Sequence, residues 1–380
     1  MLAIPQYTLL TGNRCINCHV NVQGGGLRNE LGWYAQDGNG LVKPSDIGLG
    51  FAEKLLTSNT VKVLDRDLTL GFDFRFQSSR SLVPSPVEGE LPSRNNFPMQ
   101  FALNASYAPT DWMFLEGQYN PGRRPYSSSG QQSWTASVNI QPSLDYPQLR
   151  IGYFQPHVGI RYDDHTMLAR RDVSGSGTTS YIMAPNYAEW GAELNYYSSL
   201  WYSVTAAVYS ADNTRDIRFN TSEGTTRSLI TSTSRPSTLL RFSLTPRFLD
   251  DNINTNVGAS VLNNGDFTMI NTFAGVGWSD VACLMVEQMS AGNKNERQLR
   301  NLSAELMVRI MSPLYVYARG EQGKTTSIIN DAEQSVRQTQ YTFGAQIFLL
   351  PFLEFRPEYR WIDTDTFTVR RWTFQLHMFY

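Results

Sequence analysis

From about residue 68 to the C-terminus, apolar and polar residues alternate along the chain with a period of two. Successive side chains of a β-strand point to opposite faces, so this alternation predicts strands whose two faces meet different solvents. In the segment 68–77, one face carries leucine and phenylalanine, and the other carries Thr69, Asp73, Arg75 and Gln77.

The clearest alternation lies close to the C-terminus. One face of this segment carries Leu353, Phe355, Pro357, Tyr359 and Trp361, and the other carries Glu354, Arg356, Glu358 and Arg360. The inner face of a soluble β-sandwich rarely holds four consecutive charges, whereas a water-filled lumen accommodates them. The pattern therefore predicts a wall with lipid on one side and water on the other.

About sixteen such segments of roughly 8–13 residues follow one another, a length suited to tilted strands that cross a bilayer. They begin near residues 68, 98, 112, 133, 149, 188, 201, 238, 253, 267, 281, 300, 314, 339, 352 and 369. Seven connections are tight, and they alternate with looser ones that include 78–96, 120–132, 157–187, 210–237, 290–299 and 324–338. We expect an all-β fold, a transmembrane antiparallel up-and-down β-barrel of about 16 strands with both termini on the short-turn, periplasmic side. A soluble β-sandwich or propeller is the alternative, but it does not explain short turns on one side and long loops on the other.

Composition agrees with a barrel. The 380 residues include 20 Phe, 19 Tyr and 8 Trp, although only 41% of the chain is hydrophobic. No run of about 18 apolar residues exists, so the pattern predicts no transmembrane helix. The net charge of −2 gives no electrostatic basis for binding nucleic acid.

A C-x-x-C-H segment near the N-terminus, Cys15-Ile16-Asn17-Cys18-His19, indicates different chemistry. This spacing places two thiols to form thioethers with the vinyl groups of a haem, and the next imidazole to ligate its iron. We therefore expect one covalent haem c, attached at Cys15 and Cys18, with His19 as the proximal ligand.

Three other interpretations of the motif explain less. A structural zinc site needs about four ligands, and the motif supplies three with no second C-x-x-C in the chain. A thioredoxin-like pair needs a βαβ context that is not recognisable here. A disulfide between Cys15 and Cys18 leaves His19 unexplained, and Cys283 is too distant in sequence to suggest a disulfide framework.

We predict two units, a monohaem c-type cytochrome segment at 1–62 and a porin-like barrel at 63–380. The first unit is rich in glycine and too short to build a core alone, so a covalent haem would supply the missing core. It is expected to act as a plug or as a periplasmic cap of the barrel.

The distal haem ligand is open among several residues. His165 is the preferred candidate, because the connection 157–187 is too long for a passive turn and Asp163 or Asp164 could orient its imidazole. His157 and His377 are alternatives, and so are four methionines, Met167, Met183, Met285 and Met289. Arg28 is the candidate for a contact with a haem propionate. Charged residues of the lumen face are interpreted as pore lining or as groups that grip the plug.

An N-terminal C-x-x-C-H followed by a porin-like barrel resembles the fused monohaem cytochrome–porins of the bacterial outer membrane. The segment Cys15–Asn21 with Gly24-Gly25-Gly26-Leu27-Arg28 is similar to haem segments of related barrel cytochromes, and 152–166 is similar to a loop of the same barrels. The resemblance implies electron transfer across that membrane, for instance from ferrous iron outside.

The expected function is electron transfer across or at the bacterial outer membrane through a single haem c held by the barrel. The alternative is an outer-membrane porin, or an anchor of a larger cytochrome assembly, in which the haem domain is a structural plug. Expected partners are outer-membrane lipid and redox partners on the periplasmic and extracellular sides, such as multihaem cytochromes. We expect an electron carrier, not a haem enzyme.

Overall fold

The fold is seen in a computed structural model of the whole chain. The structure describes residues 5–21, 24, 26–29, 32, 40–55, 58–85, 89–121, 133–143, 145–160, 166–173, 179–184, 187–197, 201–215, 218–220, 226–228, 235–265, 267–293, 297–329 and 332–380.

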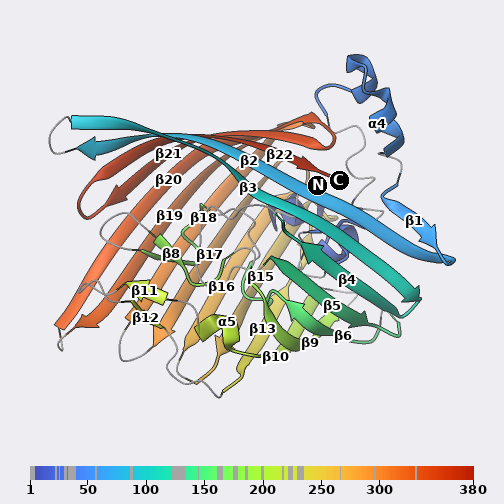
Figure 1. Cartoon of the computed structure of the whole chain (residues 1–380), viewed down its shortest axis with the longest axis horizontal. Helices are drawn as coiled ribbons and strands as arrows, with labels where there is room; N and C mark the ends of the chain where they lie inside the picture. The colour runs from blue at the N-terminus through green and yellow to red at the C-terminus, as the bar shows by residue number, and fades with distance from the viewer. Residues whose placement is uncertain are drawn as a thin grey trace.

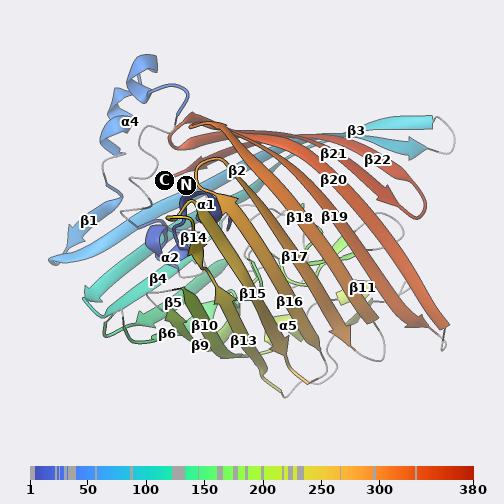
Figure 2. The same cartoon turned by 180° about the vertical axis from the view of Figure 1, so that it is seen from behind.

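Sixteen antiparallel strands form a closed barrel (Figures 1 and 2). They are β2 (Arg66–Ser85), β3 (Gly89–Thr110), β4 (Met113–Tyr119), β5 (Trp134–Ile140), β6 (Gln148–Phe154), β9 (Glu189–Tyr197), β10 (Tyr202–Tyr209), β13 (Ser237–Leu244), β15 (Ile253–Asn263), β16 (Thr268–Trp278), β17 (Ala282–Asn293), β18 (Arg297–Met311), β19 (Leu314–Ile329), β20 (Ala332–Leu350), β21 (Leu353–Thr364) and β22 (Thr368–Phe379). Each pairs with the next, and β22 pairs with β2 from Asp73↔Phe379 to Leu82↔Arg370, which closes the sheet. The predicted fold class is confirmed, and every predicted segment corresponds to one of these strands.

The polarity of the barrel is the reverse of that of a soluble protein. Many side chains that point inward are polar and buried, as at Arg75, Gln77 and Glu358, while large apolar side chains on the outside remain exposed. The outer face carries Leu103, Leu115, Ile151, Leu194, Leu240, Phe242, Val257, Ile270, Val276, Leu284, Leu302 and Leu306. A face of this kind is stable only against lipid.

Three connections that the sequence predicts as long loops are largely strand. β2 and β3 pair up to Ser85↔Gly89, β19 and β20 pair up to Ile329↔Ala332, and β17 and β18 pair up to Asn293↔Arg297. The 22 residues of β3 span about 70 Å, well beyond the roughly 30 Å of hydrocarbon. Their outer parts lie beyond the hydrocarbon, where both faces can be polar, so the apolar alternation that marks a strand is lost although the backbone ladder continues.

Other connections contain small elements of their own. The 155–188 connection contains β7 (Arg171–Val173) and β8 (Thr179–Tyr181), and 210–236 contains α5 (Asp212–Arg215), β11 (Arg218–Asn220) and β12 (Thr226–Ser228). β14 (Arg247–Phe248) extends the short turn before β15.

The N-terminal segment lies at the short-turn end of the barrel, partly inside and partly outside it. α1 (Pro5–Thr11) and α2 (Cys15–Cys18) are inside, whereas η1 (Pro44–Ile47) and α4 (Gly50–Leu55) project beyond the rim (Figure 1). β1 (Thr60–Val63) then pairs with β2. Within the described residues, no helix is both long enough and apolar enough to cross a membrane.

Placing a charge on the outer face tests whether lipid covers it. Leu240 is 60% exposed at the middle of β13, so we expect Leu240→Arg to lower the free energy of unfolding by about 2–4 kcal/mol in a bilayer. The measurement is urea unfolding in lipid vesicles, followed by tryptophan fluorescence. Val281→Arg, in the short turn before β17, is the control, with an expected loss of about 0–1 kcal/mol. Equal losses at both positions would show that lipid does not cover Leu240.

Candidate functional site

Helix α1 packs against the inner wall of the barrel. Tyr7, Leu9 and Leu10 are buried in an apolar cluster with Phe273, Cys283, Met285, Met307, Tyr315, Tyr317, Phe348 and Phe379. The wall admits the helix because β16 has glycine at its closest point: a Cβ on Gly277 would lie 2.3 Å from the Leu9 carbonyl oxygen, and one on Gly275 would lie 2.6 Å from Leu9 Cδ1. The helix is thus seated in a groove that any larger residue would fill.

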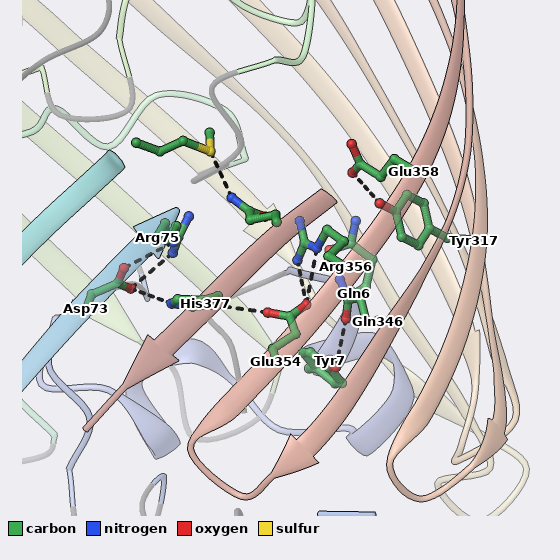
Figure 3. A network of polar contacts seen from close by, with 12 residues as sticks. Gln6, Tyr7, Asp73, Arg75, Tyr317, Gln346, Glu354, Arg356, Glu358 and His377 are labelled. Carbon is green, nitrogen blue, oxygen red and sulfur yellow. Dashed lines mark hydrogen bonds and ion pairs between the residues drawn. The ribbon is translucent and has the colours of Figure 1, made fainter. Parts of the chain in front are cut away.

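Polar side chains of the wall hold α1 in place. Tyr7 Oη donates to Gln346 Oε1 at 3.0 Å (Figure 3). Asn254 Nδ2 donates to the Leu9 carbonyl at 2.9 Å, and Gln6 Nε2 donates to Glu305. These contacts support the predicted role of lumen-facing polar residues in gripping the N-terminal segment. They also favour the plug over the cap for α1.

His377 belongs to the same network and is an unsuitable iron ligand. Its Nε2 lies 3.0 Å from Asp73 Oδ2, and its Nδ1 lies 3.1 Å from Glu354 Oε2 (Figure 3). Both ring nitrogens are therefore engaged by carboxylates of the wall.

The C-x-x-C-H segment forms the single turn α2. Cys15 is half-buried, and Cys18 and His19 are buried. The His19 amide donates to the Cys15 carbonyl at 2.9 Å, and the two cysteines, three residues apart on a helical turn, lie on one face of it. Asn29 closes the turn, because its amide donates to the Cys18 carbonyl at 3.1 Å and its Nδ2 donates to the Asn17 carbonyl at 3.2 Å. Sequence reasoning missed this role of Asn29.

Arg28 is buried beside His19 and the last strand. It forms an antiparallel bridge with His19, and its guanidinium stands 4.1 Å from the centroid of the Phe379 ring. Burial lowers the pKa of Arg28 to about 10, and the nearby Asp73 carboxylate opposes this shift. Arg28 therefore anchors the segment to the last strand, and its predicted propionate contact stays a prediction.

A cavity of about 960 Å³ adjoins α2 at the short-turn mouth of the barrel. Cys15 lines one side of it, and His157, Tyr197 and Arg241 line the wall. Trp201, Pro246 and Asp251 of the short turns line its outer part. Its volume lies within the range of about 300–1,000 Å³ that is usual for cofactor and ligand pockets.

The polar atoms of this cavity suit an occupant with an anionic edge. Within the part of the chain that the structure describes, the buried Tyr197 hydroxyl has no hydrogen-bond partner and can donate to a bound carboxylate, whereas the unpartnered Oδ1 atoms of Asn254 and Asn256 are acceptors that need a donor such as water. Buried polar groups require a partner, from water or from a bound group. Burial and the nearby Arg247 guanidinium lower the pKa of Arg14, which also lines the cavity, and a bound carboxylate would relieve that repulsion. Of the C-x-x-C-H segment, Cys15, Ile16 and Asn17 line this cavity, whereas Cys18 and His19 do not. A haem c attached through Cys15 would border the cavity, and its attachment at Cys18 and ligation by His19 stay predictions.

The other candidates for the distal haem ligand do not share one location. His157 lines the cavity, and its Nδ1 lies 3.3 Å from Thr205 Oγ1. His165, with Asp163 and Asp164, lies outside the described residues. The four methionines Met167, Met183, Met285 and Met289 are buried in apolar clusters, which accounts for them as packing.

The 155–188 connection folds into the lumen, as its length suggested. Its apolar residues are buried, and the Leu168 amide donates to Glu321 Oε1 of the wall at 2.7 Å. Asp172 accepts from Arg297 Nη2 at 2.6 Å. The lumen is thus occupied from both ends, by the N-terminal segment and by this connection.

Known proteins with this architecture are outer-membrane barrels. No protein-family model matches the chain, and no curated protein matches it in sequence. The outer membrane channel DcaP of Acinetobacter baumannii superposes with a TM-score of 0.55 at 9% identity, over 84% of this chain and 99% of that chain. OprB of Pseudomonas putida does so with a TM-score of 0.52 at 10% identity, over 88% and 97%. OmpT of Vibrio cholerae gives 0.51 at 9% identity, over 85% and 100%. The chain therefore has the fold of porin-like outer-membrane barrels, and these similarities extend no further than the fold.

The close approach of α1 to β16 gives a test of the plug. We expect Gly277→Ala to push Leu9 away from the wall, because the new Cβ would lie 2.3 Å from a backbone oxygen. Single-channel conductance in planar bilayers should rise, and residues 5–21 should become more sensitive to protease. Gly320→Ala is the matched control, since its Cβ would meet only Tyr341 at 3.9 Å. Unchanged conductance and protease resistance in Gly277→Ala would contradict this seating of α1.

Proposed function

We propose that the protein is a bacterial outer-membrane barrel that carries one covalent haem c at its short-turn mouth and transfers electrons there. The observation that supports this most is the position of α2. The only C-x-x-C-H segment of the chain forms a turn beside a cavity of about 960 Å³ at the short-turn mouth of the barrel.

Different residues would bind different parts of the haem. Cys15 and Cys18 would form the two thioethers, and His19 would be the proximal ligand of the iron. Haem c supplies one-electron redox chemistry when it is bound. Arg14, Arg241 and the Tyr197 hydroxyl are the cavity groups that would bind its propionates, by charge and by hydrogen bonding.

His157 is the distal ligand that the geometry favours. The Thr205 hydroxyl donates to Asn195 Oδ1 at 2.7 Å, so towards His157 it acts as an acceptor of the Nδ1 proton at 3.3 Å. This arrangement assigns the lone pair to Nε2, the nitrogen that would ligate iron. His165 remains a prediction from the sequence.

The segments that fold into the lumen, α1 and the described part of the 155–188 connection, favour an electron carrier over a wide open pore. Electrons tunnel through packed protein, whereas solutes need a continuous water path. The cavity borders the turns at 141–147 and 245–251, so a periplasmic redox partner, such as a multihaem cytochrome, would reach it directly. The apolar outer face supports insertion in the outer membrane, and we expect a carrier rather than an enzyme.

Electron transfer at the short-turn mouth tests the proposal. With the protein in the vesicle wall, a membrane-impermeant donor added on the side of the short turns should reduce the haem, and an impermeant acceptor added on the same side should reoxidise it. Cys15→Ser with Cys18→Ser should abolish this transfer and the haem stain on a denaturing gel, because the thioethers cannot form. The same variant should keep the heat-resistant mobility of the folded barrel, which makes it a matched control. Equal rates for both proteins, or a haem stain that persists in the variant, would contradict the assignment.

The spin state of the iron tests His157. We expect His157→Ala to convert a six-coordinate low-spin spectrum to high spin while haem stays attached. The control is His377→Ala, which should keep the low-spin spectrum because the wall engages that ring on both sides. A low-spin spectrum in His157→Ala would leave His165 as the ligand to test next.

A second candidate function is a channel or an anchor in which the N-terminal segment is only a plug. The likeness of the fold to the outer membrane channel DcaP favours it. Under this alternative, the wild-type protein conducts ions, and the Cys15→Ser, Cys18→Ser variant conducts equally well.

A further inference from the structure

Six basic side chains form a belt on the outer face of the barrel at its long-loop end. They lie on six of seven consecutive strands from β18 round to β3: Arg300, Lys324, Arg337, Arg370, Arg80 and Arg94. The five arginines are exposed and Lys324 is half-buried. Their alternation with buried neighbours, such as Leu299, Gln338 and Val369, places all six on the outside of the wall.

The register of the sheet sets these charges against one another. Arg300 is the partner of Lys324, and Lys324 is the partner of Arg337, so three cations stand side by side on β18, β19 and β20. On the other side of β21, Arg80 and Arg94 are direct partners on β2 and β3. Like charges directly opposite each other destabilise a sheet, so this arrangement requires counter-charges from outside the strands.

At the short-turn end, by contrast, basic residues form ion pairs with carboxylates of the protein. There Lys62 pairs with Asp67 at 2.6 Å, Arg66 pairs with Asp111 at 2.8 Å, and Arg309 pairs with Asp280. Among the residues that the structure describes, the belt has Asp363 and Asp365 in its vicinity, near the end of β21. Asp363 accepts from Thr368 Oγ1 at 2.6 Å, and Asp365 accepts from the Arg337 amide at 2.8 Å. Glu333 lies further out on β20. Positive charge therefore dominates one rim of the outer face.

Aromatic side chains mark the depth of the belt in the membrane. Trp361 is the cross-strand partner of Arg370, and Trp372 is the partner of Arg80. Both tryptophans are exposed, as is Tyr341 beside Trp361. Exposed Trp and Tyr on a barrel lie at the boundary between hydrocarbon and head groups. The basic belt thus stands at the level of the lipid head groups.

We propose that this basic belt binds the phosphate groups of lipopolysaccharide, the anionic glycolipid of the outer leaflet. The inference rests on the outer-membrane placement under the proposed function, and is independent of haem. Guanidinium groups bind phosphate by paired, charge-assisted hydrogen bonds, and basic clusters at the head-group level attract anionic lipid. Phosphates between Arg300, Lys324 and Arg337 would supply the counter-charges that the sheet does not.

Binding of labelled lipid A to detergent-solubilised, full-length protein tests the proposal. We expect the triple variant Arg300→Gln, Lys324→Gln, Arg337→Gln to bind bisphosphorylated lipid A at least tenfold more weakly. The matched control removes three cations from the other rim, Lys62→Gln, Arg66→Gln and Arg309→Gln, and should bind as the wild type does. Monophosphorylated lipid A should bind more weakly than the bisphosphorylated form, and about 10 mM inorganic phosphate should compete only weakly because it lacks the acyl chains.

The lipid A measurements test the belt, and the haem measurements test the proposed electron transfer separately. Equal binding by the two triple variants would overturn the proposal, and so would equal binding of lipid A and of phosphatidylglycerol vesicles, which would indicate unspecific charge attraction. Haem stain and spin state are measured in the same samples. If those fail while lipid A binding follows the expected order, the proposed electron transfer is wrong and the belt stands. A triple variant that loses the heat-resistant barrel is replaced by Arg80→Gln with Arg94→Gln, for which weaker lipid A binding is again expected.

Discussion

Closure of the hydrogen-bonded sheet is the constraint on which the rest of this molecule depends. Inside a bilayer, a backbone polar group has no water to bind, so each must find its partner within the wall. The pairing of β22 with β2 satisfies the last free edge. In the closed sheet, successive side chains of each strand point alternately to the lipid and to the lumen. The outer face is apolar because it meets lipid, and much of the inner face is polar because it meets water.

A polar lumen determines how a segment can be held inside it. The wall offers amide, hydroxyl and carboxylate groups to α1, and it adds an apolar patch around Phe273 and Tyr315 where Tyr7, Leu9 and Leu10 are buried. The helix and the described part of the 155–188 connection both pack against the inner wall. Beside Cys15 lies a cavity that is lined by cationic and hydrogen-bonding side chains. The proposed binding of haem is based on this cavity.

The strands could be predicted because a wall between lipid and water has alternating apolar and polar residues along each strand. Glu354, Glu358 and Arg360 point inward and Trp361 points outward, as the alternation indicates. The alternation ends beyond the hydrocarbon, where both faces can be polar, so the outer halves of β2, β3, β19 and β20 were predicted as loops. Backbone pairing there leaves no mark in the hydrophobic pattern.

By itself the sequence determined a sixteen-stranded wall, its polarity and a C-x-x-C-H segment, since these depend on local periodicity and on a covalent spacing of five residues. Only the tertiary structure decided which distant residues meet. It brought His157 to the cavity of Cys15, engaged His377 with two carboxylates, and directed Arg28 to Phe379. It also set Arg300, Lys324 and Arg337 in one row. The physical reason is that contacts across a barrel are set by strand register and by closure, which connect residues hundreds of positions apart and have no local pattern.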